Sequence, residues 1–119
     1  GKRRVDIPVG VSYGDKLGQV EEIAINAVEQ LDFILKDDGV SFVYTEFGSS
    51  SVNGRVMFWI EYQAEVSYLE ARHKAMIAIK QAFDQNDILI PFPIRTLDFG
   101  IKGGEKLSTM IRQNELELN

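Results

Sequence analysis

Few residues of this chain are suited to catalysis, and their spacing builds no catalytic site. His73 is the only histidine, and it lies between Arg72 and Lys74 in a stretch with helical periodicity. A histidine that acts as a general base needs a nucleophile within hydrogen-bond reach and a partner that orients its ring. Two flanking cations indicate a position on the surface of a helix. The sequence therefore predicts a protein that is not an enzyme.

The sequence also gives no support for a metal-binding or phosphate-binding site. The carboxylates at 37–38, 84 and 87 lack the ordered spacing of a calcium loop. With zero cysteines the chain has no thiolate ligand and no disulfide. Residues 48–51 (GSSS) are followed by a strand pattern, whereas a phosphate-binding loop opens into a helix. We expect no metal and no cofactor.

Aromatic and basic residues of one predicted strand suggest an alternative, a ligand- or RNA-binding module. Arg55, Phe58, Trp59 and Tyr62 invite comparison with modules that stack bases on aromatic side chains of a sheet, although the Gly-aromatic-Gly-Phe pattern of those modules is absent. The net charge of −5 argues against this alternative, because phosphate binding depends on clustered Lys and Arg. We expect no nucleic-acid partner.

Arg72 is a charged residue inside an apolar helical stripe. Helical periodicity places it beside Leu69, Met76 and Ile79. Its aliphatic stem can pack while the guanidinium reaches water. Alternatively, the guanidinium pairs with a carboxylate of the same or a neighbouring subunit. Both interpretations remain open at this point.

The hydropathy pattern predicts the elements that position these residues. Apolar residues alternate with polar ones in the strands and recur every three or four positions in the helices. Pro8 predicts that the first strand lies at a sheet edge or has a local irregularity there. The expected strands lie at 5–11, 42–47, 52–62 and from 88 onward, and the expected helices at about 15–31 and 64–85.

This order, strand–helix–strand–strand–helix–strand, predicts an α+β fold of the ferredoxin-like, split βαβ type (βαββαβ). We expect a four-stranded antiparallel sheet with two helices on one face, because each helix has a single apolar stripe. In the third strand, the even positions 52–62 are the expected core side, and the odd positions 53–61 a wet or partner-facing side. No window approaches the roughly 20 apolar residues of a membrane span, so the chain is expected to be soluble.

Three short segments occur together in a characteristic order and at characteristic distances. They are residues 6–14 (DIPVGVSYG), 46–53 (EFGSSSVN) and 90–96 (IPFPIRT). With these segments the chain resembles the C-terminal cytoplasmic domain of the small-conductance mechanosensitive channel family, from about residue 3 to residue 99. The match of all three segments, with the same elements between them, is specific.

The resemblance implies a function and a location. Residues 1–102 would form the cytoplasmic α/β domain, and residues 103–119 a polar tail. Seven copies would build a homoheptameric cage below a tension-gated pore, where the cage filters solutes and ions released during osmotic stress. The domain would lie on the cytoplasmic face of the inner membrane, held there only by transmembrane helices upstream of this chain.

The resemblance also implies a surface for self-association. The last strand of each copy would join a parallel barrel at the cage floor, so that a C-terminal strand serves inter-subunit packing. The candidate residues for this oligomer interface are Thr96, Leu97, Asp98, Phe99, Ile101 and Arg72.

Overall fold

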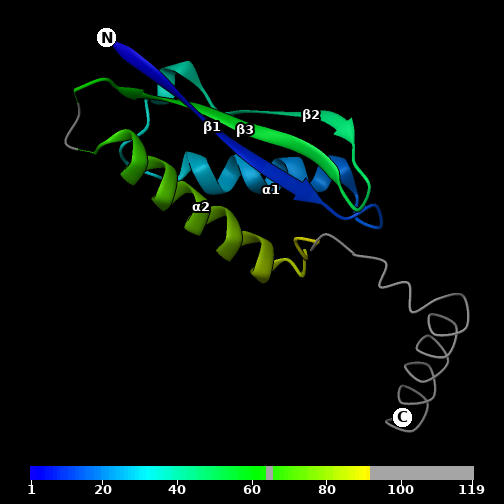
Figure 1. Cartoon of the computed structure of the whole chain (residues 1–119). Coiled ribbons are helices and arrows are strands. Elements are labelled where there is room, and N and C mark those ends of the chain that lie inside the picture. Colours follow the sequence, from blue (N-terminus) through cyan, green and yellow to red (C-terminus); the bar gives the residue numbers. More distant parts are fainter. Residues whose placement is uncertain (64–65, 92–119) are drawn as a thin grey trace, which may run out of the picture.

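A computed structural model describes residues 1–63 and 66–91, which form a three-stranded antiparallel sheet backed by two helices (Figure 1). The strand order is β1-β3-β2, so β3 is central. The predicted α+β class is therefore confirmed. In chain order the elements are β1 (Lys2–Val11), α1 (Leu17–Glu29), the 3-10 turn η1 (Lys36–Asp38), β2 (Ser41–Phe47), β3 (Val52–Glu61) and α2 (Tyr68–Gln85).

The sheet is built on β3. β1 pairs with β3 along its whole length, from Lys2 opposite Glu61 to Val11 opposite Val52. β2 and β3 form the predicted hairpin, with a register shift between Tyr44 and Glu46. Such a shift bends the strand locally and increases its twist.

The core lies between one face of the sheet and the two helices, which lie on the same side of it (Figure 1). Alternation in the strands and the helical period place the apolar residues on these facing surfaces. The predicted core side of the third strand is confirmed up to Ile60, whereas Tyr62 follows the end of β3 and is 66% exposed. The buried residues of the core elements are Val5, Ile7, Val9, Val11, Val20, Ala24, Val28, Phe42, Val52, Val56, Phe58, Ile60, Ala71, Ala75, Ile79 and Phe83.

α2 is rotated relative to the prediction. Leu69 and Met76, expected in its buried stripe, are 74% and 49% exposed. Ala71 is buried in their place, next to Ala75, which the prediction also placed in the core. Small side chains at these positions let the helix axis approach the sheet and α1, which large side chains would prevent.

The predicted fourth strand does not form within the described residues. Residues 88–91 lie outside the sheet, and residues 96–101 lie outside the part that the structure describes. The Gly1 carbonyl accepts a hydrogen bond from the Tyr62 N–H, so the backbone N–H and C=O groups of the odd residues of β1 point toward β3. The backbone groups of the even residues point toward the outer edge of the sheet. Pro8, on this outer edge as predicted, has no N–H to offer a further strand.

Gly54 provides a test of how closely β2 and β3 approach. An added Cβ would lie 2.6 Å from the Val43 carbonyl oxygen and 2.9 Å from Cε1 of Phe42. We expect Gly54→Ala to lower the free energy of unfolding by about 1–3 kcal/mol, because backbone must shift. The measurement is urea unfolding followed by circular dichroism.

The matched control is Gly18→Ala in α1, where an added Cβ has no heavy atom within 4 Å. This change should raise the free energy of unfolding by about 0.5–1 kcal/mol, because alanine favours the helix. Equal effects of the two substitutions would contradict the close approach at Gly54.

Candidate functional site

In the part of the chain that the structure describes, the side chains suited to metal binding do not form a cluster. His73 is exposed on α2, as predicted. Its neighbour Lys74 pairs with Glu70, with 3.3 Å between the ammonium nitrogen and a carboxylate oxygen. Within residues 1–63 and 66–91, no group of three or more His, Asp or Glu side chains is arranged to hold a metal ion.

The first two sequence segments meet near the end of β1, and Ile90, the first residue of the third segment, lies against β1. Tyr13 of the first segment stacks on Phe47 of the second, with ring centroids 6.5 Å apart and planes 17° apart. The Tyr13 hydroxyl also donates a hydrogen bond to the Gly48 carbonyl. Ile90 of the third segment lines a groove of about 200 Å³ with residues 7–10 of β1 and with Met76, Ile79 and Lys80 of α2.

A polar network holds the second segment in its turn. The Asn53 amide accepts a hydrogen bond from the Ser51 hydroxyl at 2.6 Å and donates one to Glu46 Oε1 at 2.9 Å. A Cβ on Gly48 would lie 2.7 Å from Asn53 Nδ2 and 2.9 Å from the Ser51 carbonyl oxygen. The segment is therefore a hairpin turn held by hydrogen bonds, in which the missing side chain of Gly48 leaves room for Asn53.

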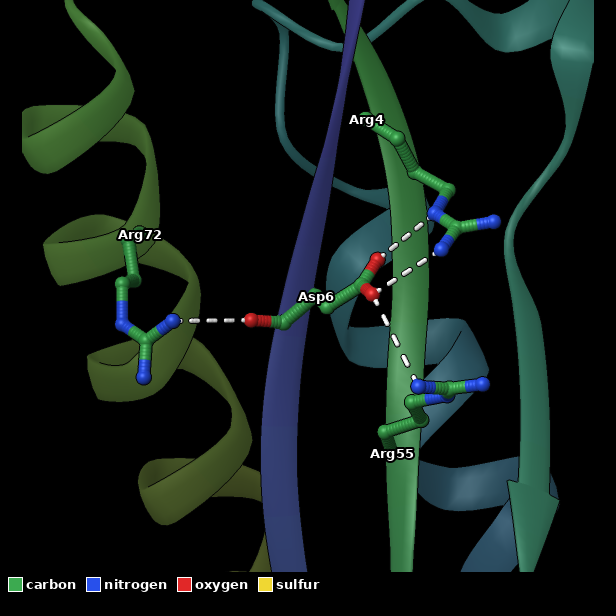
Figure 2. A network of polar contacts seen from close by, with 4 residues as sticks. All are labelled: Arg4, Asp6, Arg55 and Arg72. Atoms are coloured by element: carbon green, nitrogen blue, oxygen red, sulfur yellow. Dashed lines mark hydrogen bonds and ion pairs between the residues drawn. The ribbon is translucent and has the colours of Figure 1, made fainter.

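Asp6 is the centre of an arginine cluster that involves β1, β3 and α2 (Figure 2). Its carboxylate accepts two hydrogen bonds from Arg4, at 2.8 Å from Nε and 3.1 Å from Nη2. Arg55 of β3 approaches the same carboxylate, with 4.0 Å between Nη1 and Oδ2. The Asp6 carbonyl points the other way and accepts a hydrogen bond from Arg72 Nη1 at 2.9 Å.

The position of the charged Arg72 within an apolar stripe is thus explained by a contact that the sequence did not predict. Its side chain is half-buried, and its guanidinium binds the backbone of β1 instead of ending free in water. Because the Asp6 carbonyl lies on the outer edge of the sheet, this hydrogen bond fastens α2 to that edge. A pairing of Arg72 with a carboxylate of a neighbouring subunit stays a prediction.

The other candidate residues for self-association, Thr96, Leu97, Asp98, Phe99 and Ile101, lie outside the described residues. The role of Asp6 as the centre of the arginine cluster was not predicted from the sequence. Its signal was present, because Arg4 and Asp6 are two residues apart in a strand and so share one face of the sheet.

Tyr44 joins the hairpin to the start of α1. Its hydroxyl donates a hydrogen bond to the Leu17 carbonyl at 2.7 Å. Burial, and then the negative charges of Glu21 and Asp15, raise the pKa of the Tyr44 hydroxyl. The folded state therefore favours the protonated, neutral tyrosine.

The described residues thus form a two-layer α+β domain in which the side chains singled out above make packing contacts, hydrogen bonds and ion pairs. The family description "Mechanosensitive ion channel MscS, C-terminal" matches residues 5–90. The chain belongs to this family, as its C-terminal domain.

Individual relatives agree with the family match. A "Small-conductance mechanosensitive channel" of Edwardsiella ictaluri is 37% identical over 92 residues, which is 77% of this chain and 31% of the relative. One of Helicobacter pylori is 31% identical over 100 residues, covering 84% of this chain and 35% of the relative. The chain thus spans about a third of the length of these relatives.

A solved structure has the same fold. The crystal structure of Helicobacter pylori MscS in its closed state matches with a TM-score of 0.71 at 30% identity. The match covers 84% of this chain and 38% of that one. The predicted resemblance to the small-conductance mechanosensitive channel family is confirmed.

Arg72→Met provides a test of the α2 contact, because methionine keeps an apolar stem and removes the donor. We expect the free energy of unfolding to fall by about 1 kcal/mol, since the Asp6 carbonyl loses its protein partner but remains near water. Thermal unfolding measures the change. His73→Ala, one position along α2 and exposed, is the control and should have no effect. Equal stability of the two variants would contradict the proposed contribution of the Arg72 hydrogen bond.

Tyr44 gives a pH prediction. A tyrosine whose pKa is raised by folding contributes stability that is fully present below the unfolded pKa of about 10. That contribution is lost as pH rises through the higher folded pKa. Between about pH 9 and pH 11, the free energy of unfolding should fall more steeply in the unmodified protein than in Tyr44→Phe. Parallel pH profiles of the two proteins would show that folding does not shift this tyrosine.

Proposed function

We propose that this chain is the cytoplasmic module of a tension-gated ion channel, on the inner face of the cell membrane. The observation that carries the proposal is the match over 84% of the chain to the closed-state structure of Helicobacter pylori MscS. Family membership also favours this function over an independent ligand- or RNA-binding module of the same topology. The module would turn over no substrate.

The proposed domain covers residues 1–102, and residues 103–119 form a polar tail. No helix in residues 1–63 and 66–91 is long and apolar enough to cross a membrane. Contact with the bilayer would come from helices in another part of a longer protein. Relatives about three times as long as the matched region are consistent with such a protein.

Self-association into a heptameric cage is the central role that we propose. The last strand of each copy, with Thr96, Leu97, Asp98, Phe99 and Ile101, would join a parallel barrel at the cage floor. Alternation of Leu97, Phe99 and Ile101 supports this role, because a barrel strand has one inner and one outer face. Arg72 would lie near a neighbouring subunit.

The cage would also filter the solutes and ions that pass to the pore during osmotic stress. Each copy carries a net charge of −5, and a ring of copies repeats this charge around the openings of the cage. Charged walls of one sign raise the local concentration of counter-ions. The proposed partners are therefore further copies of the chain and the ions and solutes in passage.

The function is tested in cells that lack their own mechanosensitive channels. The longer protein that carries this chain should restore survival of an osmotic downshock and give tension-activated currents in membrane patches. Replacement of the chain by an unrelated monomeric domain should reduce both. A longer protein that gives no tension-activated current would overturn the proposal.

Phe99→Asp tests the cage floor. In the longer protein the change should weaken assembly, because it places an unpaired charge within a packed strand of every copy, at a cost of several kcal/mol per copy. The number of copies is measured by native mass spectrometry. The isolated chain with the same substitution should keep its stability. An unchanged assembly with an unfolded isolated variant would place Phe99 in the core of the domain instead.

A further inference from the structure

The chain contains one Asn-Gly pair, Asn53-Gly54, and the pair lies at the start of the central strand β3, beside the hairpin turn (Figure 1). Asparagine is among the thermolabile residues of proteins. It loses its side-chain amide most readily before glycine, because glycine has no side chain to hinder its own backbone nitrogen. The pair is therefore a candidate site of covalent modification.

The modification needs no enzyme and consumes only water. The backbone nitrogen of Gly54 attacks Cγ of Asn53, forms a C–N bond and gives its proton to solvent. The bond from Cγ to Nδ2 breaks, and this nitrogen takes up a proton from solvent and leaves as ammonia. Water then opens the resulting succinimide ring at one of its two carbonyl carbons. The product is aspartate, or isoaspartate in which the main chain runs through Cγ.

The sheet keeps the attacking nitrogen occupied. Gly54 lies opposite Val9, one of the odd residues of β1 whose backbone groups point toward β3. The residues of such a pair exchange both backbone hydrogen bonds, so the Gly54 N–H is directed at the Val9 carbonyl. Ring closure also requires Asn53 to leave the extended backbone conformation of a strand. Modification therefore depends on the opening of this end of the sheet.

The amide that would leave is held as well. Asn53 is half-buried, and its Oδ1 accepts a hydrogen bond from the Ser51 hydroxyl at 2.6 Å. Its Nδ2 donates to Glu46 Oε1 at 2.9 Å. The Thr45 hydroxyl donates to the Asn53 carbonyl oxygen at 3.3 Å. These contacts fix the residue toward β2 and the turn.

We propose that Asn53-Gly54 is a site of spontaneous deamidation whose rate is set by local opening of the hairpin turn and the start of β3. In the closed state, hydrogen bonds hold both the attacking nitrogen and the leaving amide, so only the open state reacts. When opening and reclosing are fast compared with the chemistry, the observed rate is the chemical rate multiplied by the open fraction. The inference concerns the chain by itself and does not depend on self-association.

Either product weakens the hairpin turn. Aspartate at position 53 would place a second carboxylate against Glu46, where the amide now donates at 2.9 Å. Two like charges at this distance disfavour each other. Isoaspartate would add an atom to the main chain of β3 and disturb the pairing of Gly54 with Val9. Because Tyr13 stacks on Phe47 beside this turn, modification would also loosen the contact between the first two segments.

Peptide mapping by mass spectrometry tests the site in the unmodified chain. At mildly alkaline pH, Asn53 should be modified at least about tenfold more slowly in the folded chain than in guanidinium chloride. Hydrogen exchange of the Gly54 N–H reports the same opening, and its slowing by the fold should be no larger than that of deamidation. Equal deamidation rates in the folded and unfolded chain would overturn the protection. An unfolded chain that keeps its asparagine would overturn the site itself.

Ser51→Ala tests the turn, because it removes the donor to Asn53 Oδ1. In the folded chain the rate of deamidation should rise severalfold. In guanidinium chloride the rate should stay unchanged, which excludes an effect on the chemistry. Ser41→Ala, at an exposed serine at the start of β2, is the control and should change neither rate. An unchanged rate in folded Ser51→Ala would overturn the role of the turn; if this variant does not fold, the exchange measurement on the unmodified chain decides.

Asn53→Asp tests the consequence, because it reproduces the aspartate product. The midpoint of thermal unfolding should fall relative to the unmodified chain. Glu46→Gln in the same chain should recover most of the loss, since the glutamine amide can donate to the new carboxylate. Glu46→Gln alone is the reference for the double variant. Equal losses in Asn53→Asp with and without Glu46→Gln would overturn the repulsion between the two carboxylates.

Discussion

The structure depends on the burial of one face of a three-stranded sheet by two helices. Phe58 of β3 and Phe83 of α2 are both 0% exposed in this layer. Burial of a phenylalanine side chain contributes about 1.5–3 kcal/mol. Because side chains alternate along a strand, the same burial places Asp6, Arg55 and Trp59 on the opposite face. Both the stability of the domain and its exposed chemistry follow from this single division.

The sequence predicted the first three strands well and the second helix less well, for a physical reason. A period of two leaves only two possible faces, and Val5 to Val11 identify the buried one. A helix can rotate by small steps, and hydrophobicity alone favours the large Leu69 and Met76 over the small Ala71. Close packing reverses that preference, because the short distance between helix and sheet requires small side chains. A hydrophobic pattern in the sequence carries no information on the distance between the helix and the sheet.

The candidate site was predictable only in part. The sequence identified Arg72 as unusual, but its partner is a backbone carbonyl, and every residue has one. Only the fold selects Asp6 among them, since it lies on the edge of β1 that pairs with no other described strand, opposite that part of α2. The contact between the first two segments could likewise not be predicted from their spacing, because the geometry of the sheet brings Tyr13 and Phe47 together. The family resemblance was carried by these segments, and the structure shows the contact between Tyr13 and Phe47.

The edge of β1 has a consequence for any crowded state of this domain. Copies tethered side by side have effective concentrations in the millimolar range, at which a bare edge of ten residues would recruit a foreign strand. Pro8 removes one donor from that edge, and Arg72 occupies a neighbouring acceptor. Both features make this edge of β1 a poorer template for pairing with a strand of another chain.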